Sequence, residues 1–198
     1  MPISSRFSFF AHQSMYLRFV VETLLLIGLV LGACPGWGAD PEQGWKAIGV
    51  RYGFEATSRS SEFHQVEAYT TYGLPWSVRG ASGWGVAMQV NASAGVLRSE
   101  DETGFIGTLG PGIIFDEPNT GFAVDLGGDL CVLSKYKFNN VDLNGNPLFE
   151  GHFGVAYRFL SGPGVSYRFQ HMSNGGLGLH GPGNTGLDMH MFGVSWNF

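Results

Sequence analysis

The sequence is poor in charged residues and cysteine, and it has few long apolar runs. Charged residues make up 14% of the 198 residues, and the net charge of −5 provides no basic surface of the kind that binds nucleic acid. Cysteine occurs only at Cys34 and Cys131, so disulfide bonds do not hold the fold together. After residue 39 no window has a sustained 3.6-residue apolar period or the length of a membrane helix. Helical domains and helical membrane proteins are therefore excluded.

The apolar run at the N-terminus is typical of a secretory signal. Two arginines precede the apolar residues 24–31, and small residues follow them. The run is too short to span a bilayer comfortably. We expect cleavage after Ala39 or a residue or so before it. The predicted organisation is a cleaved signal peptide at residues 1–39 and a single domain at residues 40–198.

Two details of this N-terminal segment stay open. Translation could begin at Met15, because the segment from there has the usual proportions of a signal peptide. Residues 31–34 also resemble a lipoprotein cleavage box, which would leave Cys34 as an acylated N-terminus.

The sequence is rich in glycine, phenylalanine and alternating apolar and polar residues. It contains 31 Gly and 16 Phe. Alternation with period two is typical of β-strands, and strands of about ten residues cross a bilayer when they are tilted. Pro111, inside the fourth segment, predicts a local break or bulge. The pattern predicts eight strands, at residues 46–57, 63–72, 83–96, 104–115, 121–133, 148–159, 165–173 and 188–198.

The two faces of these strands differ in a way that favours a membrane barrel. One face carries Phe, Tyr, Trp and Val, and the other holds small residues with charges. Small and charged side chains fit the narrow lumen of an eight-stranded barrel, and large apolar ones fit lipid. The predicted fold class is all-β, an eight-stranded antiparallel transmembrane β-barrel of the outer-membrane type. A soluble lipocalin-like barrel is the alternative. The predicted luminal charges are Arg51, Glu55, Asp125, Asp129, Glu150 and Arg158.

The predicted connections alternate in length, which indicates orientation. The segments at 134–147 and 174–187 are long and lie at one end of the barrel. Outer-membrane barrels have short periplasmic turns and longer external loops, so both chain ends are expected in the periplasm. The predicted turn at 73–82 fits this rule poorly, because it is as long as some outer loops.

A histidine and a serine lie on the apolar face of the seventh predicted strand. His171 and Ser173 are two residues apart and point the same way, so they can share a proton. Asp188 opens the next predicted strand, also on its apolar face. By themselves His171 and Ser173 also fit the start of a polar outer loop. The combination of a base, a nucleophile and an acid at the rim favours a catalytic site.

These residues carry a resemblance to a known family. Residues 171–177 (HMSNGGL) followed by 184–188 (NTGLD) resemble the motif of the PagL-type lipid A 3-O-deacylases, eight-stranded outer-membrane barrels that remove the 3-O-linked acyl chain from lipid A. The resemblance implies that Ser173 is the nucleophile, that His171 is its general base and that Asp188 orients His171. The acid in the family is often Glu, so the shorter Asp188 leaves the distance between the acid and the imidazole in question.

The resemblance also implies donors for the developing oxyanion. Asn174, Asn184 and the backbone N–H of Gly176 match the candidate donors of the family. A plain turn residue is an equally good interpretation of Asn184.

The implied function is that of a carboxylic ester hydrolase of the bacterial outer membrane. Its substrate would be lipid A of lipopolysaccharide in the outer leaflet, from which it would release a 3-hydroxy fatty acid, with no metal or other cofactor and no nucleic-acid partner. Whether the chain forms a homodimer is left open. The alternative is a non-enzymatic small outer-membrane barrel with a structural or adhesion role.

Other candidate sites in the sequence are weaker. Residues 142–146 resemble the start of a calcium loop, but the twelfth position is Phe153 instead of a bidentate Glu. His190 could support the acid or simply anchor the barrel at the membrane interface. Four histidines show no metal-ligand spacing with cysteine or acidic partners, namely His64, His152, His180 and His190.

Overall fold

A computed structural model describes residues 42–57, 62–175 and 186–198. The predicted signal peptide at residues 1–39, with the alternatives at Met15 and Cys34, lies outside these residues. Within them, no helix is long and apolar enough to cross a membrane.

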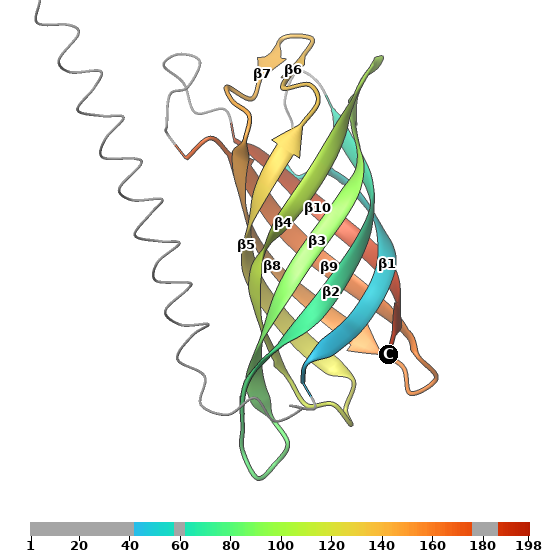
Figure 1. The fold of residues 1–198 in the computed structure, drawn as a ribbon. Coiled ribbons are helices and arrows are strands. Elements are labelled where there is room, and N and C mark those ends of the chain that lie inside the picture. Colours follow the sequence, from blue (N-terminus) through green and yellow to red (C-terminus); the bar gives the residue numbers. More distant parts are fainter. Residues whose placement is uncertain (1–41, 58–61, 176–185) are drawn as a thin grey trace, which may run out of the picture. The chain divides into compact units, whose positions relative to one another are not determined.

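Eight long strands close into an antiparallel barrel (Figure 1). Strands that follow one another in the chain pair with each other, and β10 pairs back onto β1 to close the sheet. Closure matters because a sheet in lipid must pair its own backbone N–H and C=O groups. The predicted fold class is confirmed. The long strands are β1 (Gly44–Glu55), β2 (Phe63–Arg79), β3 (Gly85–Ser99), β4 (Glu102–Asp116), β5 (Phe122–Leu133), β8 (Leu148–Arg158), β9 (Pro163–Ser173) and β10 (Leu187–Asn197).

β2 is longer than the sequence pattern predicted. It runs to Arg79, and most of the expected turn at 73–82 is strand. Its pairing with β3 skips from Gly73 to Ser77, so a bulge accommodates Pro75, which cannot donate to the ladder. The backbone N–H of Gly80 donates to the carbonyl of Trp84 at 2.9 Å and closes a short turn. This end of the barrel therefore has the short turn that the sequence analysis missed.

The predicted break at Pro111 affects only one side of β4. Pro111 pairs with Val90 in a continuous ladder to β3. Toward β5 the pairing stops at Leu109 and resumes at Gly112. A proline without an N–H explains this one-sided gap.

The outer wall of the barrel is apolar and has aromatic rings near its ends. The end that contains the start of β1 and the C-terminus carries Trp45 packed edge-on against Tyr72, with ring centroids 5.3 Å apart, and Trp84 stacked on Phe115 at 5.0 Å. Such rings sit favourably at the boundary between lipid and water. Between the ends, the exposed apolar side chains include Val50, Val66, Leu109, Ile113, Leu126, Phe153, Val165 and Val194.

The lumen toward the end with the C-terminus is polar and contains ion pairs. Arg51 Nε lies 2.9 Å from Glu67 Oε1, and Arg168 donates to Asp125 Oδ2 at 3.0 Å. Glu67 also accepts hydrogen bonds from Gln65 and Ser93, both at 2.8 Å. The prediction that charges face the lumen is confirmed, because Arg51, Asp129 and Glu150 are buried and Glu55, Asp125 and Arg158 are half-buried.

The opposite end of the lumen is filled by apolar side chains, which the sequence analysis did not foresee. A short hairpin of β6 (Lys137–Phe138) and β7 (Val141–Asp142) lies within the loop between β5 and β8. Phe138 of the hairpin is fully buried and packs edge-on against Phe63, with centroids 5.5 Å apart. This apolar plug consists of Phe63, Leu97, Ile106, Cys131, Leu133, Phe138, Val141, Leu143, Leu148, Met172, Leu187, Met189 and Met191.

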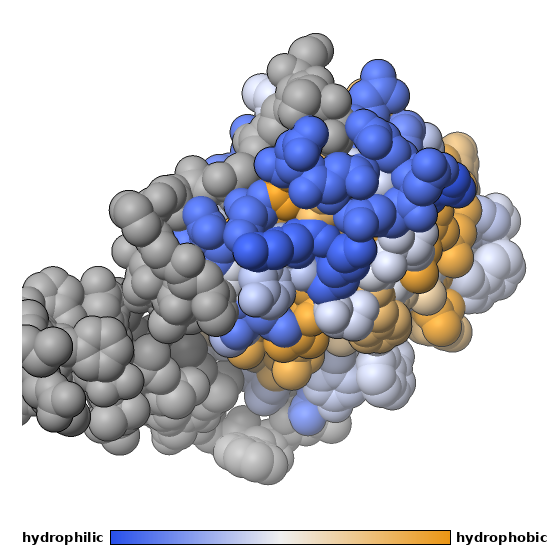
Figure 2. Space-filling view, turned by 90° about the horizontal axis from the view of Figure 1, so that it is seen from above, coloured by the Kyte–Doolittle hydropathy of each residue, from blue (hydrophilic) through white to orange (hydrophobic). Residues whose placement is uncertain are grey.

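The same loop is tied to the barrel by side-chain hydrogen bonds. Asn146 accepts from the N–H of Leu133 at 3.1 Å and donates to its carbonyl at 2.6 Å, so it extends the pairing of β5. Asp142, in the sequence that resembles a calcium loop, pairs with Lys137 at 3.0 Å and accepts from the N–H of Asn144 at 2.9 Å. Figure 2, which looks onto this end, shows hydrophilic residues gathered over it and hydrophobic ones on the flanks.

We expect Phe138→Ala to loosen this loop without opening the barrel. Removing a buried Phe leaves a cavity and costs about 3–5 kcal/mol of unfolding free energy. Denaturant unfolding in detergent, together with limited proteolysis of residues 134–147, measures the effect. Asn140→Ala, at an exposed hairpin position, is the matched control and should change stability by less than about 0.5 kcal/mol. Equal stability of the two variants would show that the hairpin does not plug the barrel.

Candidate functional site

His171 and Asp188 meet on the outside of the barrel because the register of two strands places them side by side. β9 pairs with β10 so that His171 lies directly opposite Asp188. Directly opposite residues of an antiparallel pair have Cβ atoms about 4.5–5.5 Å apart and project from the same face. Their neighbours Met172, Leu187 and Met189 are fully buried, so the two polar side chains face outward.

The imidazole and the carboxylate are in direct contact. His171 Nδ1 lies 2.6 Å from Asp188 Oδ1, and the two side chains are 49% and 26% exposed. Asp188 reaches the imidazole despite its short side chain, because the register places it directly opposite His171. With Nδ1 used by the carboxylate, Nε2 is the nitrogen left to accept a proton. This is an acid–base pair placed at the rim of an apolar wall.

Ser173 shares the outward face with His171 but is not hydrogen-bonded to it. It is the last residue of β9, is half-buried and pairs with Phe149 of β8. Two residues along a strand span about 6.5 Å, so the hydroxyl needs a rotation or a small shift to reach Nε2. Among the described residues there is no hydrogen bond between Ser173 and His171. In structures without substrate, catalytic hydrogen bonds are often long.

Gly186 is a feature of the site that the sequence analysis did not single out. A Cβ built on Gly186 would lie 2.5 Å from Cε1 and 3.1 Å from Nε2 of His171. The glycine backbone therefore packs against the edge of the imidazole that contains Cε1 and Nε2. The only signal in the sequence was its place in the motif at 184–188, which does not reveal this contact.

The oxyanion residues implied by the family resemblance are not all on this face. Asn174 has the opposite parity to Ser173, is 1% exposed, and donates from Nδ2 to the carbonyl of Asn144 at 3.1 Å. Its side chain ties the end of β9 to the loop that precedes β8. Gly176 and Asn184 lie outside the described residues, as does His180.

His190 belongs to an aromatic patch below the acid–base pair. Its Nδ1 lies 2.8 Å from the hydroxyl of Tyr167, and its ring packs near Phe54 and Phe169 with centroids 5.6 and 5.7 Å away. Phe192 packs against both Tyr167 and Phe54. These contacts favour the interpretation of His190 as an anchor in the wall.

A separate groove of about 640 Å³ opens on the rim at β1, β2 and β3. It contains none of His171, Ser173 and Asp188. Its walls combine acidic and basic groups, and Tyr52 and His64 are joined by a hydrogen bond of 2.9 Å. The lining residues are Tyr52, Glu62, His64, Arg98 and Glu100.

Comparisons with known proteins agree with this architecture. The chain is similar to the crystal structure of the outer membrane enzyme PagL, at 17% sequence identity and a TM-score of 0.62, with 76% of this chain and 99% of that chain covered. At this identity the similarity shows the fold alone. The backbone structure of the Yersinia pestis outer membrane protein Ail in a phospholipid bilayer nanodisc is a weaker match, at 11% identity and a TM-score of 0.40, covering 79% of this chain and 100% of that chain.

The comparison of sequences gives the family. Curated protein sequences gave no significant match. The model of the family described as lipid A 3-O-deacylase (PagL) matches residues 64–197, which is more than half of the chain and includes β2 through β10. The chain therefore belongs to the lipid A 3-O-deacylase (PagL) family and is an ester hydrolase of the outer membrane.

Proposed function

We propose that the chain removes the 3-O-linked acyl chain from lipid A with a Ser173–His171–Asp188 triad on the lipid-facing wall. The observation that supports it most is the 2.6 Å contact between His171 and Asp188 on the outside of the barrel. A paired acid and imidazole with a serine two residues away are the parts that serine hydrolases use, whatever their fold.

Each residue has a defined step in this reaction. The Ser173 oxygen attacks the ester carbonyl while His171 Nε2 takes the hydroxyl proton. The C–O bond to the sugar then breaks, and His171 returns the proton to the departing sugar oxygen. A water molecule, deprotonated by the same nitrogen, attacks the acyl-enzyme; the bond to the Ser173 oxygen breaks, that oxygen takes the proton back from His171, and a 3-hydroxy fatty acid is released. Asp188 holds the ring in the required tautomer and stabilises its positive charge.

The donors to the developing oxyanion are proposed from the family resemblance. Gly176 and Asn184 keep this role in the proposal. Asn174 is a third candidate from the resemblance, and its side chain is buried and bonded to the carbonyl of Asn144, so it also supports the end of β9 next to Ser173.

The position of the site suits a substrate that stays in the membrane. The long connections at 134–147 and 174–186 are at the end of the barrel where the site lies, so we infer that this end faces the outside of the cell. Lipid A esters lie near the headgroup boundary of the outer leaflet. Below the triad, the patch of Phe54, Tyr167, Phe169 and Phe192 offers an apolar surface for acyl chains.

Family membership sets aside the non-enzymatic barrel as an account of the whole chain. Family membership does not test whether the chain forms a homodimer, which stays a separate prediction. The direct test of activity is to incubate the detergent-solubilised protein with lipopolysaccharide and to measure lipid A by mass spectrometry. We expect the loss of one hydroxyacyl group.

Ser173→Ala should abolish this activity and leave the fold intact. Loss of the nucleophile is expected to lower kcat by more than about 10³-fold. Release of 3-hydroxy fatty acid is the readout, and heat-dependent mobility on gels checks the barrel. Ser166→Ala, at an inward position on the same strand, should remain active. Full activity of Ser173→Ala would exclude this residue as the nucleophile.

Asp188→Asn tests the role of the carboxylate. The amide keeps the shape but favours the wrong imidazole tautomer, and we expect a fall of about 10⁴-fold in kcat. Asp101→Asn, at an exposed turn on the same end of the barrel, serves as the control. A fall smaller than about tenfold would mean that the contact with His171 is not used in catalysis.

Gly186→Ala tests whether the backbone positions the imidazole. The added methyl group would collide with the His171 ring at Cε1 and push it away from its present place. A displacement of about 1 Å can cost about 10²-fold in rate. Gly107→Ala, on the far side of the barrel where a Cβ meets only ordinary contacts of 3.6 Å or more, should have normal activity. Equal rates of both variants would argue against this positioning role.

A further inference from the structure

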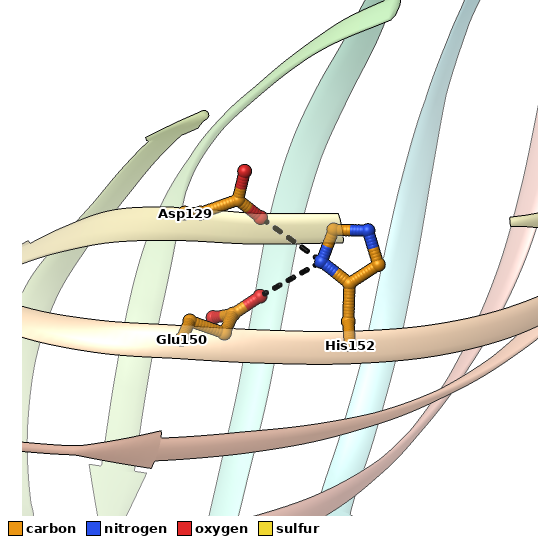
Figure 3. Close-up of side chains that lie close together, drawn as sticks. All are labelled: Asp129, Glu150 and His152. Carbon is orange, nitrogen blue, oxygen red and sulfur yellow. Dashed lines mark ion pairs between the residues drawn. The ribbon is translucent and has the colours of Figure 1, made fainter. Parts of the chain in front are cut away.

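Three potential metal ligands gather inside the barrel, on the far side of the wall from the triad. Asp129 of β5 lies directly opposite Glu150 of β8, and His152 follows two residues later on the same face. His152 Nδ1 is 3.1 Å from Asp129 Oδ2 and 4.0 Å from Glu150 Oε1. Figure 3 shows both carboxylates directed at this nitrogen.

The two carboxylates are buried without adequate partners. Asp129, Glu150 and His152 are 3%, 4% and 5% exposed. Within the described residues, Glu150 Oε2 and both oxygens of Asp129 lack a hydrogen-bond donor in good geometry. Like charges directly opposite each other destabilise a sheet, and a buried carboxylate needs a compensating group. Asp129 and Glu150 therefore need a positively charged group that compensates their charge.

Neighbouring luminal charges do not supply it. Arg51 is paired with Glu67 at 2.9 Å, and Arg168 with Asp125 at 3.0 Å. Among the described residues, no arginine forms an ion pair with Asp129 or Glu150, and the group in contact with them is the imidazole of His152, which lies between Asp129 and Asp125. With both carboxylates ionised, this group of two carboxylates and one imidazole carries a net negative charge even when His152 is protonated.

The distances suit a small divalent cation. Zn²⁺ binds imidazole nitrogen and carboxylate oxygen at about 2.0–2.2 Å, so two ligands of a tetrahedral site lie about 3.4 Å apart. The separations of 3.1 and 4.0 Å bracket this value, and the ligand atoms of the three residues lie within 4.8 Å of one another. Gly127 makes room for the ring, because a Cβ there would lie 2.5 Å from Cε1 of His152.

A luminal cavity lies next to the cluster. It has a volume of about 400 Å³ and its lining includes Asp125, Arg168 and Phe198, and Asp125 Oδ2 lies 3.3 Å from His152 Nε2. On the other side, Cys131 and Leu148 of the apolar plug follow along β5 and β8. The cluster therefore lies between this cavity and the apolar plug.

We propose that Asp129, Glu150 and His152 bind one divalent cation of the Zn²⁺ type inside the barrel, with a fourth position for water. A nitrogen ligand beside two carboxylates favours such an ion over Mg²⁺ or Ca²⁺, which prefer oxygen ligands alone. The ion joins β5 to β8 behind the outer site, since Glu150 pairs with Met172, between His171 and Ser173. Its role is structural and does not depend on the esterase proposal.

The test measures Zn²⁺ binding to the folded barrel. Protein in detergent is stripped with a chelator, dialysed and titrated with Zn²⁺ at neutral pH, and its metal content is determined by mass spectrometry after gel filtration. We expect one Zn²⁺ per chain and a higher thermal unfolding midpoint with the metal. Glu150→Gln and His152→Asn should each weaken binding by about tenfold or more.

Two controls make the result specific. His64→Asn removes a histidine from the rim groove and should bind Zn²⁺ as the wild type does. Ser173→Ala should also bind it normally, which separates this site from catalysis. The proposal is overturned if the folded wild-type barrel retains no Zn²⁺, or if Glu150→Gln and His152→Asn bind it unchanged. The measurement on the wild-type barrel tests the proposal even if one of the variants fails to fold.

Discussion

The requirement that a sheet in lipid pair all of its own backbone groups governs this structure. The pairing of β1 with β10 meets it by leaving no edge. Closure then fixes, for every strand, which alternate side chains face lipid and which face the lumen. The apolar wall, the paired luminal charges and the position of each polar residue at the rim all follow from that one constraint.

The register between strands turns this alternation into two chemically different sites on one wall. His171 lies opposite Asp188 across β9 and β10, and both project into the membrane boundary. Two strand pairs further along the sheet, Asp129 lies opposite Glu150 across β5 and β8, and both project inward. The first pair joins an acid to a base, and the acid can orient the base. The second joins two acids beside an imidazole, where we propose a cation.

The sequence predicted the strands and the outward face of His171, Ser173 and Asp188 because both depend on alternation along the chain. It could not predict that Asp188 would reach the imidazole, or that Gly186 would lie against the His171 ring, because both depend on the register between β9 and β10. The inward direction of the Asn174 side chain follows from its parity on β9, which a motif does not show. The apolar plug could not be predicted either. It depends on how the loop at 134–147 folds over the lumen, and no periodic pattern in the sequence indicates that.

The most direct test of a wall-facing triad is to label its nucleophile covalently. A lipophilic fluorophosphonate reacts with a serine only when a neighbouring base activates it, and peptide mass spectrometry identifies the modified residue. The account predicts one adduct, on Ser173, that disappears in His171→Asn and is strongly reduced in Asp188→Asn. An adduct on another serine, or an active enzyme that is never labelled at Ser173, would contradict it.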